Sequence, residues 1–134
     1  TVGTLSTRLQ PNHTTDGLEG ITASLYEGLS YGIGDAVIGL NPVTDSVSNT
    51  TEILKRFDEV KHKWEIPTQQ CVLAHITTQI EAIKRGAPAD MIFQSIAGSQ
   101  KGNEAFGFST YTIEEAVELL RDRGDCKRPE CFVL

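Results

Sequence analysis

Short apolar runs alternate with longer amphipathic stretches along the chain. Four of the runs have the length of a buried strand, and they predict strands near residues 5–10, 36–40, 72–75 and 92–95. Their nearly continuous apolar character is typical of parallel strands whose faces are covered by other elements. The pattern therefore predicts an α/β fold that repeats a strand, a loop and a helix.

Four amphipathic stretches follow these strands, and each begins with a polar residue three positions before a Glu. This is the spacing of a capping box, and the predicted caps are Asp16, Asn49, Thr78 and Thr112. Helical spacing places apolar residues on one face of three of these stretches. Those faces hold Ile21, Leu25 and Leu29, then Ile53, Leu54, Phe57, Val60 and Trp64, and finally Ile113, Ala116, Val117, Leu119 and Leu120. The predicted stops are Gly32 or Gly34, Pro67, Gly86 and Gly124.

The number of strand–helix units limits the architecture. About four units are present, whereas a complete eight-stranded (β/α) barrel needs roughly 200 or more residues. The 134 residues therefore predict either a small open sheet or about half of a TIM barrel. No stretch has the composition of a linker, so we expect one domain over residues 1–134, with parallel strands adjacent in chain order.

Composition and charge exclude several classes of function. The net charge of −6 argues against a nucleic-acid-binding protein and against electrostatic docking on an anionic membrane. No apolar run approaches the roughly 20 residues of a membrane helix, and no signal peptide opens the chain. Three cysteines without a secretion signal predict a reduced, cytoplasmic protein. The first residue is Thr1, so we expect a piece of a longer chain or a processed product.

Polar side chains gather where the predicted strands end. Arg8 and Gln10 close the first strand and share a face, Asn41 follows the second strand, and Gln94 lies in the fourth. These amides and the guanidinium suit a small polar ligand held by hydrogen bonds better than acid–base hydrolysis. Simpler interpretations remain open at this point: Arg8 in an exposed N-terminal segment, Asn41 as a turn residue, and Gln94 as a partner for the backbone.

The chain shows no pattern of a metal site. His13, His62 and His75 lack the spacing of metal ligands, and His75 is predicted to be a satisfied histidine at the end of a strand. Cys126 and Cys131 lack the close pairs and further ligands of a zinc site. We therefore expect no bound metal.

Two long blocks of this sequence, with several shorter ones, form an ordered set. The long blocks are Thr-Arg-Leu-Gln-Pro-Asn-His-Thr-Thr-Asp at 7–16 and Gly-Asp-Ala-Val-Ile-Gly-Leu-Asn-Pro-Val-Thr-Asp-Ser at 34–46. Shorter blocks lie at 19–24, 65–69, 71–75 and 85–98. In sequence, order and spacing these blocks resemble the heavy (large) chain of ethanolamine ammonia-lyases. The resemblance covers about residues 7–107.

The resemblance implies an adenosylcobalamin-dependent lyase that converts ethanolamine to acetaldehyde and ammonia by a radical mechanism. In this family the heavy chain is a (β/α) barrel with cobalamin at the C-terminal mouth, between heavy and light chains, so residues 1–134 are expected to form a single partial barrel domain. The resemblance also implies a hetero-oligomer with a light chain, located in the cytoplasm or in a bacterial microcompartment. By position, Arg8 and Asn41 resemble partners of the substrate hydroxyl, Gln10 resembles the partner of its ammonium, and Pro42 and Gln94 resemble cobalamin contacts.

The sequence departs from the family pattern towards its end. The resemblance fades after about Phe108, which predicts a divergent helix and tail over 109–134. The substrate carboxylates of the family, a Glu and an Asp, lie beyond the matched stretch, so the isolated chain is predicted to be inactive. The leading hypothesis is a portion of the lyase. The alternatives are a non-catalytic α/β fragment or binding module that keeps the site without turnover, and an unrelated flavodoxin-like sheet.

Overall fold

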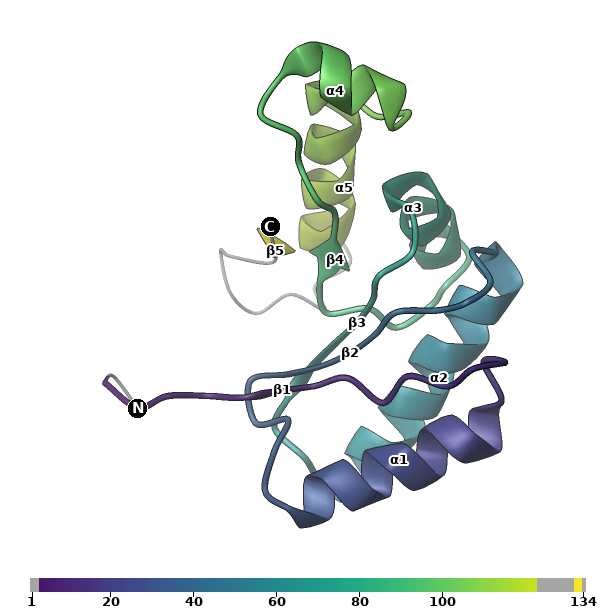
Figure 1. The fold of residues 1–134 in the computed structure, drawn as a ribbon, viewed down its shortest axis with the longest axis vertical. Coiled ribbons are helices and arrows are strands. Elements are labelled where there is room, and N and C mark those ends of the chain that lie inside the picture. Colours follow the sequence, from purple (N-terminus) through teal and green to yellow (C-terminus); the bar gives the residue numbers. More distant parts are fainter. Residues whose placement is uncertain (1–2, 123–131, 134) are drawn as a thin grey trace.

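The computed structural model describes residues 3–122 and 132–133 (Figure 1). The strands are β1 (Arg8–Leu9), β2 (Val37–Leu40), β3 (Gln69–Val72), β4 (Ile92–Phe93) and β5 (Phe132–Val133). The helices are α1 (Leu18–Ser30), α2 (Val47–Lys63), α3 (Ile76–Lys84), α4 (Gln100–Ala105) and α5 (Thr110–Asp122). The predicted alternation of strands and helices is confirmed, and α4 is an element that the sequence pattern did not predict.

The first three strands form one parallel sheet in the order β1-β2-β3. Arg8 pairs with Val37 across β1 and β2, and Gly39 pairs with Cys71 across β2 and β3. The prediction of parallel strands adjacent in chain order is confirmed for these three. β1, β2 and β4 are shorter than predicted, and β3 lies three residues earlier than the predicted range 72–75, so the two share only Val72.

The fourth strand corrects the expected architecture. β4 pairs in parallel with β5, through Ile92 and Phe132, and forms a separate two-stranded sheet. The side chain of Gln79 in α3 explains the break, because its amide bonds to both backbone groups of Phe93 that a neighbouring strand would otherwise use. The described strands thus form a mixed α/β fold without a closed barrel, and half of a TIM barrel stays a prediction.

The hydrophobic core lies between the three-stranded sheet and its helices. Leu9 packs against Gly28 of α1, and the buried Gln70 donates to the backbone oxygen of Leu54 in α2 at 3.2 Å. Figure 1 shows α1, α2 and α3 along one side of the sheet. The sheet alternates its side chains, so Arg8, Gly39 and Cys71 lie on the opposite face.

All four helix starts differ from the predicted capping boxes. α1 is capped by Gly17 without a side-chain bond, α2 by the hydroxyl of Ser46, and α3 by the ring of His75. Asp16, Asn49 and Thr78 are therefore not the caps, and Thr112 lies inside α5, which begins at Thr110. Asp16 and Asn49 instead bond to each other, with 2.8 Å between Asn49 Nδ2 and Asp16 Oδ2.

The predicted apolar faces are confirmed for most of their residues. Ile21, Leu25, Phe57 and Leu120 are fully or almost fully buried, as the helical spacing predicts. Trp64 is wrong as a core residue, because it lies past the end of α2 with 58% of its surface exposed. The predicted helix stop at Gly124 and the pair Cys126 and Cys131 lie outside the described residues.

Candidate functional site at the carboxyl ends of the strands

Arg8 lies across the open face of the sheet and does not extend into solvent. Its Nη2 atom donates to the backbone oxygen of Gly39 at 3.4 Å, and its Cζ atom lies 5.6 Å from the centre of the Phe93 ring. Its Nε atom is buried and has no hydrogen-bond partner among the described residues. The interpretation of Arg8 as part of an exposed terminal segment is therefore wrong.

The guanidinium of Arg8 has no anionic partner in the described part of the chain. The ion pairs found there all involve other residues. Cys71 lies beside it, but burial raises the pKa of this thiol to about 11, although the nearby positive charge of Arg8 opposes the shift. The thiol is consequently neutral at physiological pH, and Arg8 keeps a full positive charge available for an oxygen atom.

Asn41 and Gln94 line one hollow at the carboxyl ends of the strands. Its volume is about 370 Å³, and its wall is formed by Asn41, Asp45, Leu73, Ala74, His75, Phe93, Gln94 and Ser95. Phe93 is also the ring over which Arg8 lies. The structure thus brings Arg8, Asn41 and Gln94 to the same edge of the fold. Side-chain amides, a hydroxyl, the carboxylate of Asp45, the ring of His75 and apolar walls give this hollow a mixed character.

The rim of this hollow is held by hydrogen bonds between neighbouring loops. The Oε1 atom of Gln94 accepts from the N–H of Ile76 at 3.0 Å, so Gln94 also satisfies the start of α3. Asp45 Oδ2 accepts from the N–H of His75 at 2.8 Å. The His75 ring bonds to Thr77 Oγ1 at 2.8 Å and to the backbone oxygen of Phe106 at 2.7 Å, as expected for a satisfied histidine.

Gln10 and Pro42 lie beside the hollow but do not line it. Gln10 is exposed just beyond β1, and its side chain makes no hydrogen bond to the described residues. Pro42 is half-buried next to Asn41. The side chain of Asn41 likewise makes no bond within residues 3–122, while its backbone N–H donates to Asn12 Oδ1 at 2.9 Å. The amides of Gln10 and Asn41 are therefore free to bind a ligand.

Three residues of the site were not singled out by sequence reasoning. They are Asn12 and Asp45, which bond to the backbone of the next loop, and Phe93, whose ring packs against Arg8. Asn12 and Asp45 belong to the blocks that carry the family resemblance, which was the only sequence signal for them. Their partners lie about thirty positions away, so spacing along the chain could not identify their contacts.

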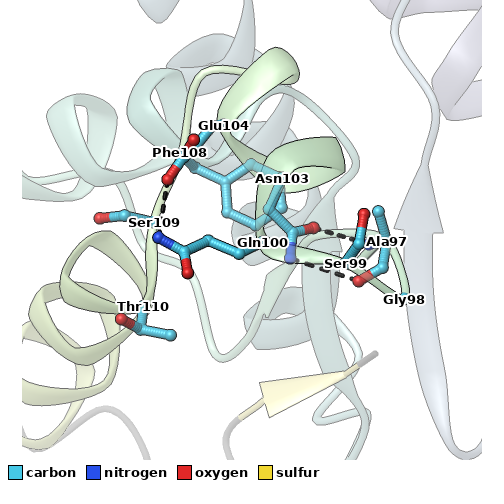
Figure 2. Close-up of a pocket in the computed structure, with 9 residues that line it drawn as sticks. All are labelled: Ala97, Gly98, Ser99, Gln100, Asn103, Glu104, Phe108, Ser109 and Thr110. Atoms are coloured by element: carbon cyan, nitrogen blue, oxygen red, sulfur yellow. Dashed lines mark hydrogen bonds between the residues drawn. The ribbon is translucent and has the colours of Figure 1, made fainter.

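A second hollow, of about 400 Å³, lies between the loop after β4, the helix α4 and the start of α5 (Figure 2). Figure 2 shows Asn103 turned towards the loop, where its Oδ1 atom accepts from the N–H of Ala97 at 2.7 Å. Gln100 bonds to Glu104 on the same helix. None of the predicted site residues lines this hollow, so we do not assign the predicted chemistry to it.

The donor set of the site limits its chemistry. One guanidinium and two free amides bind oxygen and ammonium groups by hydrogen bonds, and no pair of carboxylates suited to hydrolysis lines the hollow. Among residues 3–122, no three His, Cys, Asp or Glu side chains lie close enough to share a metal ion. No helix in the described part of the chain has the length and apolar character needed to cross a membrane.

Comparison with known proteins identifies the family. A family model described as "Ethanolamine ammonia lyase large subunit (EutB)" matches residues 1–132. The chain is 59% identical to the ethanolamine ammonia-lyase large subunit of Escherichia coli strain K12 and 60% identical to that of Salmonella typhimurium strain LT2. Each match covers 114 residues, which are 85% of this chain and 25% of the relative, so the chain spans about a quarter of their length. The chain belongs to the ethanolamine ammonia-lyase large-subunit family.

Proposed function

We propose that this chain is a portion of an adenosylcobalamin-dependent ethanolamine ammonia-lyase, which converts ethanolamine to acetaldehyde and ammonia. The observation that carries the proposal is that Arg8, Asn41 and Gln94 lie at the same edge of the fold, at a hollow lined by the free amide of Asn41 and by Gln94. The membership in the large-subunit family supports the same reaction class.

The substrate presents a hydroxyl group at one end and an ammonium group at the other. Arg8 donates to the hydroxyl oxygen, and its fixed positive charge stabilises negative charge that develops there during the rearrangement. Asn41 is the second partner of the hydroxyl. The Oε1 atom of Gln10 accepts from the ammonium, which needs acceptors rather than donors. A neutral amide performs this task without exchanging protons near a reactive intermediate.

The chemistry of the rim fits a corrin, which is a largely apolar ring with amide side chains around its edge. Gln94 uses one N–H of its side-chain amide on the backbone oxygen of Ser95 at 3.0 Å, and the described residues accept no second bond from it. Gln94 and Pro42 would hold the cofactor from this side. When bound, adenosylcobalamin supplies the radical chemistry that begins with removal of a substrate hydrogen.

The remaining parts of the site come from outside this chain. We propose that further strands of the large subunit complete a (β/α) barrel over the open face of the sheet and supply carboxylates for the substrate ammonium. The name "large subunit" of the relatives implies a smaller partner, and we propose a hetero-oligomer with a light chain. The exposed rim at the carboxyl ends of the strands is where such a partner would help to enclose cobalamin.

An activity assay with three samples tests this proposal. The complete large subunit that contains this sequence, combined with its light chain and adenosylcobalamin, is expected to form acetaldehyde and ammonia from ethanolamine. Omission of the cofactor abolishes the activity, and the isolated 134-residue chain forms no product above the control without enzyme. Its open sheet face and its missing carboxylates are the physical reasons for that inactivity.

Two results would contradict the proposal in different ways. Binding of cobalamin and ethanolamine to the complete assembly without any turnover would favour a binding module that keeps the site. Acetaldehyde formation by the isolated chain would show that the rest of the barrel is unnecessary for the reaction.

A further inference from the structure

The backbone N–H groups of the loop that follows β2 are bound by side chains of the loop that follows β1. The N–H of Asn41 donates to Asn12 Oδ1 at 2.9 Å, and the N–H groups of Val43 and Thr44 donate to the two carboxylate oxygens of Asp16 at 2.9 and 2.8 Å. Pro42 has no N–H to donate. The side chains of Asn12 and Asp16 thus accept a hydrogen bond from every backbone N–H group between Asn41 and Thr44.

Asn12 occupies a special place in this arrangement, because it contacts both residues proposed to bind the two ends of the substrate. Its backbone N–H donates to the oxygen of Gln10 at 2.9 Å, while its side-chain oxygen accepts from Asn41. We propose that Asn12 is a positioning residue that fixes the direction of the Asn41 side chain relative to Gln10. The inference rests on the proposed function, since it concerns the recognition of ethanolamine at that same site.

The backbone of Asn41 has little freedom apart from the bond to Asn12. The proline that follows restricts Asn41 to an extended conformation, and the end of β2 fixes the residue before it. The remaining freedom is a tilt of the peptide that carries the Asn41 N–H, and a tilt there moves the carboxamide. Displacements of about 1 Å at such a position can lower the reaction rate a hundredfold. The loss of a single hydrogen bond that sets this position can therefore affect the reaction.

The two ends of the substrate depend differently on Asn12. Replacement of its side chain removes the bond to Asn41 but leaves the backbone bond to Gln10 in place. Binding of the hydroxyl group should therefore weaken, while binding of the ammonium group should be unchanged. Because Asn12 is exposed, its replacement leaves no buried group without a partner, so the fold should tolerate the change.

The test compares ethanolamine with ethylamine, which keeps the ammonium group and lacks the hydroxyl. Dissociation constants of both are measured by calorimetry on the complete large subunit assembled with its light chain and loaded with cyanocobalamin, which prevents turnover. We expect Asn12→Ala to raise the dissociation constant of ethanolamine about tenfold and that of ethylamine less than twofold. Asn12→Asp keeps the acceptor atom for the Asn41 N–H and should restore most of the preference for ethanolamine.

Thr68→Val is the matched control. The Thr68 hydroxyl also joins two loops, since it donates to the backbone oxygen of Gly34 at 2.6 Å, but this bond lies at the opposite edge of the sheet. The variant should leave the ratio of the two dissociation constants unchanged, even where it lowers the unfolding temperature. If the ratio of the two dissociation constants in Asn12→Ala equals the wild-type ratio, the positioning role is overturned.

A failure of the proposed function would look different. A wild-type assembly that binds ethanolamine no better than ethylamine would contradict the assignment of the hydroxyl site itself, and the inference on Asn12 would fall with it. A wild-type assembly that prefers ethanolamine, together with an Asn12→Ala variant that keeps this preference, would overturn only the positioning role.

Discussion

Arg8 can lie flat on the sheet because the residue beneath it is a glycine. A Cβ atom built on Gly39 would come within 2.7 Å of Arg8 Nη2 and 2.9 Å of Cys71 Sγ. Both distances are far shorter than ordinary van der Waals contacts. The small residue in the middle of β2 therefore permits the close approach of a charged side chain to the backbone.

Replacement of this glycine should displace Arg8 without removing any of its atoms. We expect Gly39→Ala to lower kcat/KM for ethanolamine in the complete lyase by about tenfold or more, since the guanidinium no longer reaches its position. Gly98→Ala is the control for stability, because nothing lies within 4 Å of a Cβ at that position. An unchanged kcat/KM for Gly39→Ala would show that the location of Arg8 over the sheet has no role in the reaction.

Asp16 joins two loops through a carboxylate that is more acidic than usual. Burial alone would raise the pKa of this carboxyl group, but the bonds from the N–H groups of Val43 and Thr44 and from Asn49 outweigh burial and lower the pKa from its ordinary value of 3.8. Asp16 also adopts a positive φ of 54°, which Asp and Asn tolerate better than most residues. Asn is consequently the replacement that changes the charge with the least effect on the backbone.

The lowered pKa predicts how stability depends on pH. A carboxyl group with a lower pKa in the folded state stabilises the protein above its unfolded pKa, and the contribution is lost as the pH falls through the folded value. Asp16→Asn should cost about 2 kcal/mol of unfolding free energy at pH 7, the scale for hydrogen bonds to a charged group. Urea unfolding of the complete large subunit should show this difference shrinking below about pH 4. A difference that stays constant down to pH 3 would contradict the role of the ionised carboxylate.

At the scale of elements, a single glutamine connects α3 to β4. Gln79 is only 3% exposed, and its amide nitrogen donates to the backbone oxygens of Ala74 at 2.5 Å and Phe93 at 2.6 Å. Its amide oxygen accepts from the N–H of Phe93 at 3.2 Å. The side chain thus takes the place of a strand beside β4, and it aligns Phe93 with Arg8.

Replacement of Gln79 by an apolar residue of similar length should detach β4. Gln79→Met leaves backbone groups of Ala74 and Phe93 without partners, and we expect a loss of about 2 kcal/mol in unfolding free energy. The exposed Gln100, whose side chain bonds to Glu104 on its own helix, provides the control Gln100→Met with a change below about 0.5 kcal/mol. Equal effects of the two substitutions in chemical denaturation would show that the amide of Gln79 does not hold the strand.

The elements themselves were largely predictable from the sequence, but their ends were not. Apolar runs and helical spacing correctly predicted four strands and the buried faces of the helices, because burial requires that periodicity. The capping boxes failed, since Asp16 and Asn49 bond to each other across loops and leave the cap of α2 to Ser46. The short helix α4 has no buried residue, so no apolar pattern revealed it.

At the scale of the whole molecule, the sheet is covered by helices on one side, while its other face carries the candidate site. The rule that parallel strands end at a common edge predicted that Arg8, Gln10, Asn41 and Gln94 converge. Asn41 and Gln94 line one hollow and Arg8 contacts its Phe93 wall, while Gln10 lies outside it. The bonds of Asn12 and Asp45 to neighbouring loops could not be predicted, because they depend on how the loops are arranged in space. The roles of all five predicted site residues and the division of the chain at residue 109 stay predictions.

The most direct test of the central claim is the turnover of ethanolamine by the complete lyase with Arg8 replaced. Arg8→Ala removes a cation that lies over the site without an ionic partner among the described residues, and we expect kcat to fall by about a hundredfold, the scale for loss of one stabilising donor. Arg8→Lys should recover only part of this loss, because an ammonium group lacks the planar fork of the guanidinium.

Arg85→Ala is the matched control, since Arg85 is exposed on the helix side and pairs with Glu81 at 2.7 Å. Our interpretation predicts that this variant keeps the wild-type kcat and that Arg8→Ala unfolds within a few degrees of the wild type. A kcat for Arg8→Ala within twofold of the wild-type value would contradict the assignment of the site.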